Sequence, residues 1–221
     1  MPLRVQPRRD RKLNRLIKAA DVRRLKRGET LFEAGDDAHD VFLIQSGYIR
    51  LVESASKASR EHTVAVGGPW EVIGEEGMEE GLRRYSAVAG EPASYRALDG
   101  PAFFHVIKST EQTLTALLDG LLKDLQSARR LTSGAGGPSA TGRIALVVLE
   151  LAARWGEQQG NGVIVPQRVT HQLLADLAGT HRSTVTTTVN DWLYQGILKT
   201  AARGMHLAKP ERLERLTSVP G

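Results

Sequence analysis

Short apolar runs alternate with glycine-rich turns over the first half of the chain. The segments ETLFEAG, DVFLIQSG, YIRLVE, HTVAVGG and YSAVAG, between residues 29 and 90, each hold a few β-branched or aromatic residues. Strands of this length, separated by residues that accept a positive φ, are typical of a compact sandwich or jelly-roll barrel. The pattern predicts an all-β domain up to about residue 107.

From about Ser109 the apolar period becomes that of a helix. Its apolar positions are spaced alternately by four and three residues: Leu114, Leu118, Leu121, Leu125, Ala128 and Thr132. This is the seam of a coiled coil, and a helix over 110–133 would be about 35 Å long. We expect the seam to form a dimer. Packing on the chain's own barrel is the alternative, and Leu117 and Leu122 widen the apolar face enough for both.

A second domain follows a stretch of helix breakers. The segment SGAGGPSATG at 133–142 holds no apolar residue larger than alanine and reads as a hinge. Helical periodicity resumes in GRIALVVLELAARW, where Ile144, Val148, Leu151 and Trp155 align, and EQQGNG ends that element.

The segment 169–200 indicates a helix, a tight turn, a second helix and a short strand. Thr170 is a good N-cap for the first helix, and Gly179 supplies the turn that lets the second helix cross the first. In the second helix, Val185, Val189 and Leu193 recur every four residues and are expected to face the core.

The second helix also carries an unusual run of threonines. Thr184, Thr186, Thr187 and Thr188 lie within five positions, although a β-branched residue is a poor choice for an exposed helix. A helix that enters the major groove of DNA needs slender polar side chains, and Thr can also contact the thymine methyl group. The run therefore favours a DNA-reading helix. A helical hairpin with a merely solvated polar face is the alternative.

After this helix, GILKT and GMHLA flank the turn AARG, as the two strands of a wing would. Lys199 and Arg203 are then placed to reach the phosphate backbone.

The amino-acid composition of the chain excludes several classes of protein. The chain has no cysteine, so disulfides, cysteine-ligated zinc and iron–sulfur clusters are excluded. Its formal charge of +5 favours polyanions without requiring them. The apolar runs are shorter than the roughly 20 residues of a membrane span, and the basic first residues lack the apolar core of a secretory signal. We expect a cytoplasmic protein, no membrane association, no catalytic residues and no metal site.

Three blocks resemble one family in order and content: GETLFEAGDDAHDVFLIQSGYIRLVE, VIGEEGMEEGLRRYSAVAGE, and the helix-turn-helix with TGRIA before it. From about Leu25 to Leu216 the chain is similar to the Crp/Fnr superfamily of bacterial transcription regulators. The resemblance implies an α+β fold with an amino-terminal cyclic-nucleotide-binding-type β jelly-roll barrel, a long dimerisation helix and a carboxy-terminal winged helix-turn-helix. We expect the barrel domain at 1–108, the dimerisation helix at 109–133, the hinge at 134–142 and the DNA-binding domain at 143–221.

The resemblance also implies an effector cassette. In cyclic-AMP-binding members, a Gly-Glu pair opens the cassette, an Arg-Ser pair closes it on the phosphate, and a Thr-Ser pair on the dimer helix meets the base. Counting back from the strand YSAVAGEP puts Arg83 in the arginine position and Arg84 in the serine position, whereas counting forward from Glu75 favours Arg84. The implied set is Gly74, Glu75, Arg83, Arg84, Ser86, Thr132 and Ser133.

The effector itself is left open. Arginine can hold a phosphate or a carboxylate in a two-pronged contact, so a cyclic nucleotide fits, as does another small anion such as 2-oxoglutarate, which related regulators sense. A barrel without an effector, with Arg83 and Arg84 as a solvated surface pair, is the further alternative. A haem ligand from His39, His62 or His105 is less favoured, because lone histidines are more often ordinary surface or core residues.

On the second helix, the resemblance puts His181 and Thr184 at phosphate-contacting positions and Arg182, Ser183 and Thr187 where bases are read. The expected DNA contacts are Thr141, Thr170, His181, Arg182, Ser183, Thr184, Thr187, Lys199 and Arg203. The expected function is a sequence-specific regulator that binds a near-palindromic site in double-stranded DNA as a homodimer, with RNA polymerase as a further partner. The alternative is a cyclic-nucleotide-binding regulatory protein that acts through protein partners and would not need a DNA-reading helix.

Overall fold

The computed structural model describes residues 2–4, 11–53, 61–78, 81–109, 138–201 and 204–217, together with residues 111, 114, 115, 118, 121, 122, 125, 126 and 129. The chain divides into two compact units, Met1–Asp124 and Leu125–Gly221. We call them the amino-terminal unit and the carboxy-terminal unit.

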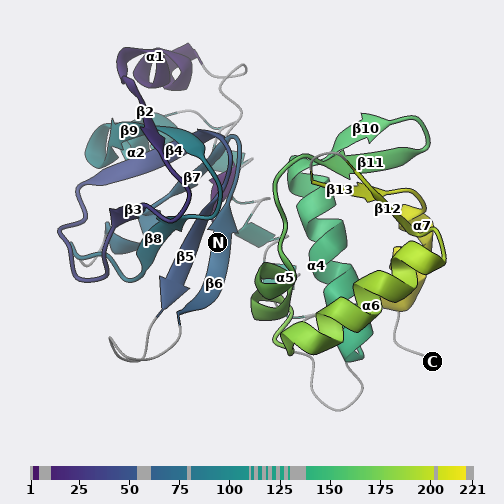
Figure 1. The fold of residues 1–221 in the computed structure, drawn as a ribbon. Coiled ribbons are helices and arrows are strands. Elements are labelled where there is room, and N and C mark those ends of the chain that lie inside the picture. Colours follow the sequence, from purple (N-terminus) through teal and green to yellow (C-terminus); the bar gives the residue numbers. More distant parts are fainter. Residues whose placement is uncertain are drawn as a thin grey trace. The chain divides into compact units, whose positions relative to one another are not determined.

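Two antiparallel sheets build the amino-terminal unit (Figure 1). Among the described residues, one sheet has five strands in the order β1-β7-β4-β9-β2 and the other has four in the order β3-β8-β5-β6. The strands are β1 (Leu3–Arg4), β2 (Val22–Leu25), β3 (Thr30–Phe32), β4 (Asp40–Ser46), β5 (Ile49–Glu53), β6 (His62–Gly67), β7 (Glu71–Ile73), β8 (Ser86–Ala89) and β9 (Ala93–Asp99).

The five-stranded sheet is buried on both faces, which explains why β4 is apolar without alternation. Successive side chains of a strand point to opposite faces. Val41 and Leu43 pack with the helices of the unit, whereas Phe42 and Ile44 pack toward the four-stranded sheet. This second core, between the sheets, includes Phe32 and Phe42, whose rings pack against the candidate sensor residue Arg83.

Two helices interrupt the region predicted to be all-β. Helix α1 (Arg11–Ala19) buries Leu13 and Ile17, which lie one turn apart. Helix α2 (Gly100–Lys108) begins where the Asp99 carboxylate accepts a hydrogen bond from the Ala102 amide at 2.8 Å. The all-β prediction was wrong here, because both helices are too short for their apolar positions to show a distinct period.

The carboxy-terminal unit combines helices with a small antiparallel sheet (Figure 1). Its helices are α4 (Ala140–Trp155), α5 (His171–Leu177), α6 (Arg182–Tyr194) and α7 (Pro210–Thr217). The sheet, counted over the described residues, has four strands in the order β10-β11-β13-β12, formed by β10 (Glu157–Gln159), β11 (Gly162–Val165), β12 (Leu198–Thr200) and β13 (Met205–Leu207). The hairpin β10–β11 lies where the sequence showed only a helix end.

The leucine stripe lies on a helix, since the described residues between 111 and 129 are helical. Leu114, Leu118, Leu121, Leu122 and Leu125 are all exposed in the single chain. The predicted hinge ends earlier than residue 142, because the Ser139 hydroxyl caps α4 by accepting from the Gly142 amide at 3.1 Å. Residues 131–137 lie outside the described part.

None of the helices in the described part of the chain combines the length and apolar character of a membrane-spanning helix.

Candidate functional site

Helices α5 and α6 form the predicted helix-turn-helix. The Thr170 hydroxyl accepts a hydrogen bond from the Leu173 amide at 3.1 Å and so caps α5. Leu173, Leu174 and Ala175 are buried. The small Ala175 also accepts the Thr180 amide through its carbonyl, at 3.0 Å, in the turn before α6.

The core face of α6 differs from the prediction. Val185 and Val189 are buried as expected, but Leu193 is 38% exposed, and Trp192 and Thr188 are buried instead, at 3% and 6% exposure. Each residue advances about 100° around a helix, so positions taken every four residues drift by about 40° a step. By Leu193 the drift has carried the side chain off the core face, and Trp192 takes that place.

The four threonines of α6 therefore lie in different environments. Thr188 is in the core. The Thr186 hydroxyl donates to the Arg182 carbonyl at 3.0 Å and lies 3.0 Å from Nδ1 of His171 on α5. Thr187 is exposed and Thr184 is half-buried.

The exposed face of α6 brings together the residues assigned to base reading. Arg182 and Ser183 are exposed in the first turn of α6 and Thr187 in the second, and His181 is exposed at the N-cap. Ser183 and Thr187 lie four residues apart and share one side of the helix, and Arg182 lies about 100° around the axis from Ser183. The described part of the chain shows no hydrogen bond or ion pair from the side chains of Arg182, Ser183 and Thr187, so all three are available to DNA.

Arg143 of α4 holds the turn between the two helices. Its Nε donates to the Ala178 carbonyl at 2.9 Å and its Nη2 to the Gly179 carbonyl at 3.3 Å. A third contact, from Nη1 to the Pro138 carbonyl at 3.3 Å, reaches the segment before α4. Sequence reasoning missed this residue, although it lies in the TGRIA block that carried the family resemblance.

The wing is present as predicted. Strands β12 and β13 pair antiparallel, with Lys199 opposite His206. Lys199 is exposed on β12. Arg203 lies outside the described residues.

Thr141, near the start of α4, lies beside α6. It lines a cavity of about 280 Å³ with Thr188 and Asp191 of α6. The other lining residues are Trp192, Gln195, Ile197, Arg212, Arg215 and Leu216. Thr141 and α6 are therefore neighbours. The hydroxyl of Thr170, another expected DNA contact, is already used to cap α5.

In the amino-terminal unit, Gly74 opens the cassette in a conformation that favours glycine. Its φ is +86°, and an added Cβ would lie 2.7 Å from Nη1 of Arg83 and 3.3 Å from the Phe42 ring. Backbone geometry and close approach therefore both require glycine at this position.

Arg83 is buried, at 4% exposure, against the core between the sheets. Its Nη1 donates to the Gly74 carbonyl and its Nη2 to the Asp40 carbonyl, each at 2.7 Å. The guanidinium carbon lies 4.5 Å from the centroid of the Phe32 ring and 5.1 Å from that of Phe42. Arg83 thus holds the ends of β4 and β7 together.

Arg84 is exposed, with its guanidinium carbon 5.9 Å from the Tyr85 ring centroid. The structure does not place the two side chains in the same environment, because Arg83 is buried in the core between the sheets and Arg84 is in solvent. The Ser86 hydroxyl accepts from the Ala34 amide at 2.9 Å. Thr132 and Ser133 lie outside the described residues.

Glu75 begins a short 3₁₀ turn (Glu75–Gly77) directly after Gly74. Burial, reinforced by the neighbouring Glu76 carboxylate, raises the pKa of Glu75 to about 8. Buried oxygens of both carboxylates have no hydrogen-bond partner in the described part of the chain. The cassette therefore combines a buried cation with a carboxyl group, that of Glu75, which burial favours in the neutral form.

Comparison with known proteins gives the same division of the chain. Residues 22–110 match the sequence family described as the cyclic nucleotide-binding domain, and residues 142–216 match the Crp-like helix-turn-helix domain. The fold and the site thus define a regulator with a cyclic-nucleotide-binding-type barrel and a DNA-binding helix-turn-helix.

Named relatives identify the family. The chain is 30% identical over 193 residues to the cyclic AMP receptor protein of Thermus thermophilus, covering 86% of this chain and 84% of that protein. It is 26% identical over 190 residues to the CRP-like cAMP-activated global transcriptional regulator of Mycobacterium tuberculosis, with the same coverage. The protein belongs to the Crp/Fnr family of transcription regulators.

Solved structures share the fold. FixK2 from Bradyrhizobium japonicum superposes with a TM-score of 0.71 at 21% identity, covering 91% of this chain and 99% of that one. TTHB099, a CRP-family transcriptional regulator from Thermus thermophilus, gives 0.65 at 26% identity, covering 88% and 96%.

Proposed function

We propose that the protein binds a near-palindromic DNA operator as a homodimer and controls transcription there. The observation that carries the proposal is the exposed face of α6, where Arg182, Ser183 and Thr187 have no partner within the described chain. These side chains can donate to base edges in the major groove, and arginine favours guanine.

The exposed leucine stripe supports the dimeric part of the proposal. Among the described residues between 114 and 125, five leucines of this helix are 37% to 57% exposed. An apolar seam of this period is normally covered by a second helix. Because two identical subunits meet around a two-fold axis, the operator would have two half-sites related by the same symmetry, about 34–36 Å apart.

A small anionic effector remains part of the proposal, with Arg83 as its cation. Arg83 is the buried guanidinium of the cassette, and its two carbonyl contacts are the bonds that an anion would compete with. Glu75, at the start of the 3₁₀ turn, would meet a hydroxyl or amine of the effector. A cyclic nucleotide and a dicarboxylate both offer an anion to Arg83, whereas only the cyclic nucleotide also offers a hydroxyl to Glu75. Relatives are named for cyclic AMP and for nitrogen regulation. RNA polymerase is the proposed protein partner, and the cytoplasm the proposed location.

Selection of bound duplexes from a random DNA pool tests the proposed function. We expect the purified full-length chain to enrich one near-palindromic sequence, and footprinting to show protection of both half-sites. A chain that enriches no sequence, or only single half-sites, would contradict the proposal. Thermal unfolding with cyclic AMP, 2-oxoglutarate and buffer alone tests the effector, because a ligand that binds the native state raises the melting temperature.

A further inference from the structure

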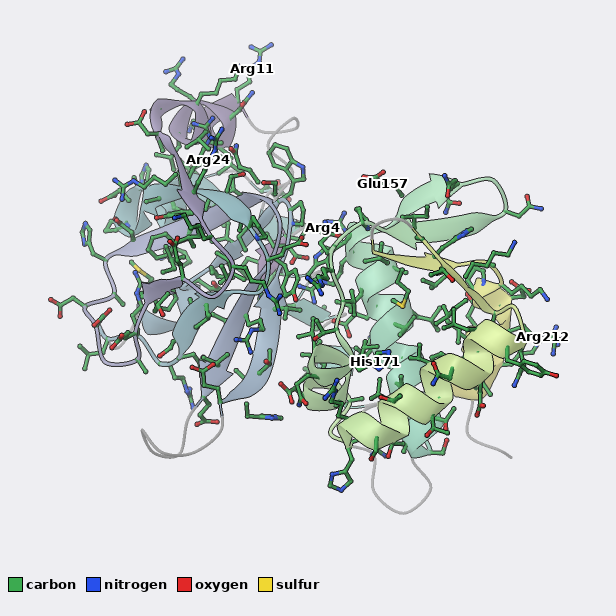
Figure 2. All side chains as sticks on the ribbon, viewed as in Figure 1. Arg4, Arg11, Arg24, Glu157, His171 and Arg212 are labelled. Atoms are coloured by element: carbon green, nitrogen blue, oxygen red, sulfur yellow. The ribbon has the colours of Figure 1, made fainter. Side chains whose placement is uncertain are left out.

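Helix α7 follows the wing, and the proposed function gives it no role. Its Leu213 is fully buried, whereas Arg212 and Arg215 are exposed. Both arginines line the cavity of about 280 Å³ to which Thr141 and Thr188 also contribute. Figure 2 shows Arg212 next to α6. We call this cavity, which lies within the carboxy-terminal unit, the α7 cavity.

Backbone contacts fix part of the wall of the α7 cavity. An added Cβ at Gly142, near the start of α4, would lie 2.7 Å from the carbonyl oxygen of Leu216, so glycine is required for α4 and α7 to approach this closely. The amides of Ala208 and Lys209 donate to the Ile197 carbonyl at 2.9 Å and 3.2 Å. Leu216 and Ile197 both line the cavity. Its shape is therefore set by how α4, α6 and α7 pack.

The polar side chains of the α7 cavity are not used by the described part of the chain. Asp191, Arg212 and Arg215 form no ion pair or side-chain hydrogen bond there. Thr188 is 6% exposed and its hydroxyl also makes no hydrogen bond, whereas the Thr186 hydroxyl donates to the backbone carbonyl four residues earlier. A buried hydroxyl without a partner is unfavourable. A polar occupant of the cavity would explain why this core position is not valine.

The residues that line the cavity determine the chemistry of its occupant. Two guanidinium groups three residues apart on one helix favour an anion, and arginine can hold a carboxylate through two parallel hydrogen bonds. The Asp191 carboxylate repels a second anionic group but accepts from a hydroxyl or an amino group. Trp192, Ile197 and Leu216 form an apolar part of the wall. The volume of about 280 Å³ is near the lower end of the roughly 300–1,000 Å³ of ligand sites.

We propose that the α7 cavity binds a small organic acid that has an apolar ring and one hydrogen-bond donor away from its carboxylate. Arg212 and Arg215 bind the carboxylate, and Asp191 accepts from the donor. The Thr188 hydroxyl gains its missing partner. A DNA phosphate fits less well, because it leaves the apolar wall uncovered and meets the negative charge of Asp191. The effector cassette belongs to the other unit, so this is a second site, and the inference does not depend on operator binding.

The test compares 4-aminobenzoate with benzoate, which lacks the amino donor, and with benzamide, which lacks the negative charge. We expect isothermal titration of the full-length protein to show saturable binding of 4-aminobenzoate, weaker binding of benzoate and no binding of benzamide. Replacing Arg212 and Arg215 by Gln should weaken 4-aminobenzoate binding about tenfold or more, because two charge-assisted contacts are lost. Thr188→Val, which removes only the hydroxyl contact, should weaken it about threefold.

Lys209→Gln is the matched control, because it removes an exposed cation just before α7 that does not line the cavity. It should bind all three compounds as the wild type does. Asp191→Ala should lower the affinity for 4-aminobenzoate to that for benzoate. If the double Gln variant binds 4-aminobenzoate as tightly as the wild type, the acid binds elsewhere, for example at Arg83, and the proposal is wrong. It is also wrong if the wild type binds none of the three compounds at millimolar concentration, or if the double variant loses affinity only for operator DNA.

Discussion

Arg83 and Gly74 are joined within the amino-terminal unit: Nη1 of Arg83 donates to the Gly74 carbonyl at 2.7 Å. The same nitrogen lies 2.7 Å from where a Cβ of residue 74 would be. The arginine that family resemblance assigns to an effector thus also stabilises the cassette itself, and an anion that binds it must compete with two backbone carbonyls.

The first prediction follows from this double role. Arg83→Ala leaves the carbonyls of Gly74 and Asp40 without their donor, so it should lower the free energy of unfolding by about 2–4 kcal/mol. Arg84→Ala, at an exposed position, should change it by less than about 0.5 kcal/mol. Urea denaturation of both variants measures the difference. Equal effects would mean that Arg83 does not hold the cassette.

The second prediction concerns pH. The pKa of Glu75 is about 8 in the folded protein against an ordinary value of 4.5. Between these values the folded state holds an extra proton, so the free energy of unfolding should fall as pH rises from 5 to 8 and then level off. This group contributes at most about 1.4 kcal/mol per pH unit. Denaturation at pH 6, 7 and 8 should show the fall in the wild type.

Two variants isolate the Glu75 contribution. Glu75→Gln cannot titrate and should have a flatter pH profile, with higher stability than the wild type at pH 8. Glu76→Gln removes the neighbouring negative charge and should move the fall to lower pH. A Glu75→Gln profile parallel to that of the wild type would assign the pH dependence to other groups.

The third prediction concerns assembly. Replacing Leu118 and Leu121 by Glu puts charge into the proposed apolar seam, where its desolvation is unfavourable. We expect monomers in sedimentation and weak operator binding, since one half-site is then read alone. Gln126→Glu, which adds a charge at an exposed polar position of the same helix, is the control and should remain dimeric. A double variant that stays dimeric would show that the leucine stripe is not the dimer interface.

The fourth prediction concerns base reading. Arg182→Ala should weaken operator binding by about 1–3 kcal/mol and relax preference at one base pair per half-site. Thr184→Ala should weaken all sequences alike, because its assigned contact is a phosphate. A panel of single-base operator variants distinguishes the two. If Arg182→Ala weakens binding equally to every operator variant, Arg182 contacts a phosphate and does not read a base.

The fifth prediction concerns the turn between α5 and α6. Arg143→Ala removes the donor for the Ala178, Gly179 and Pro138 carbonyls. It should weaken binding to every operator without changing base preference, and destabilise the carboxy-terminal unit by about 1–3 kcal/mol. Operator titrations and circular dichroism melting check both parts. A changed base preference would show that Arg143 itself reads DNA.

The amino-acid sequence by itself determined the elements that depend on residues close together in the chain. The Thr170 cap, the wing strands around AARG and the buried positions Val185 and Val189 were all predicted, because caps, turns and helical periods depend on residues within a few positions of one another. The family resemblance extended this to the order of the parts, from the barrel to the winged helix-turn-helix.

Only the tertiary structure decided how distant residues share a site. Arg83 and Arg84 are adjacent in sequence, yet the core between the sheets takes one guanidinium and leaves the other in solvent. Arg143 reaches a turn 35 residues away, and Arg96 contacts the end of a helix that lies 79 residues earlier in the chain. These contacts depend on which carbonyl the folded chain brings within about 3 Å of a guanidinium, and the linear pattern of polar and apolar residues does not encode that distance.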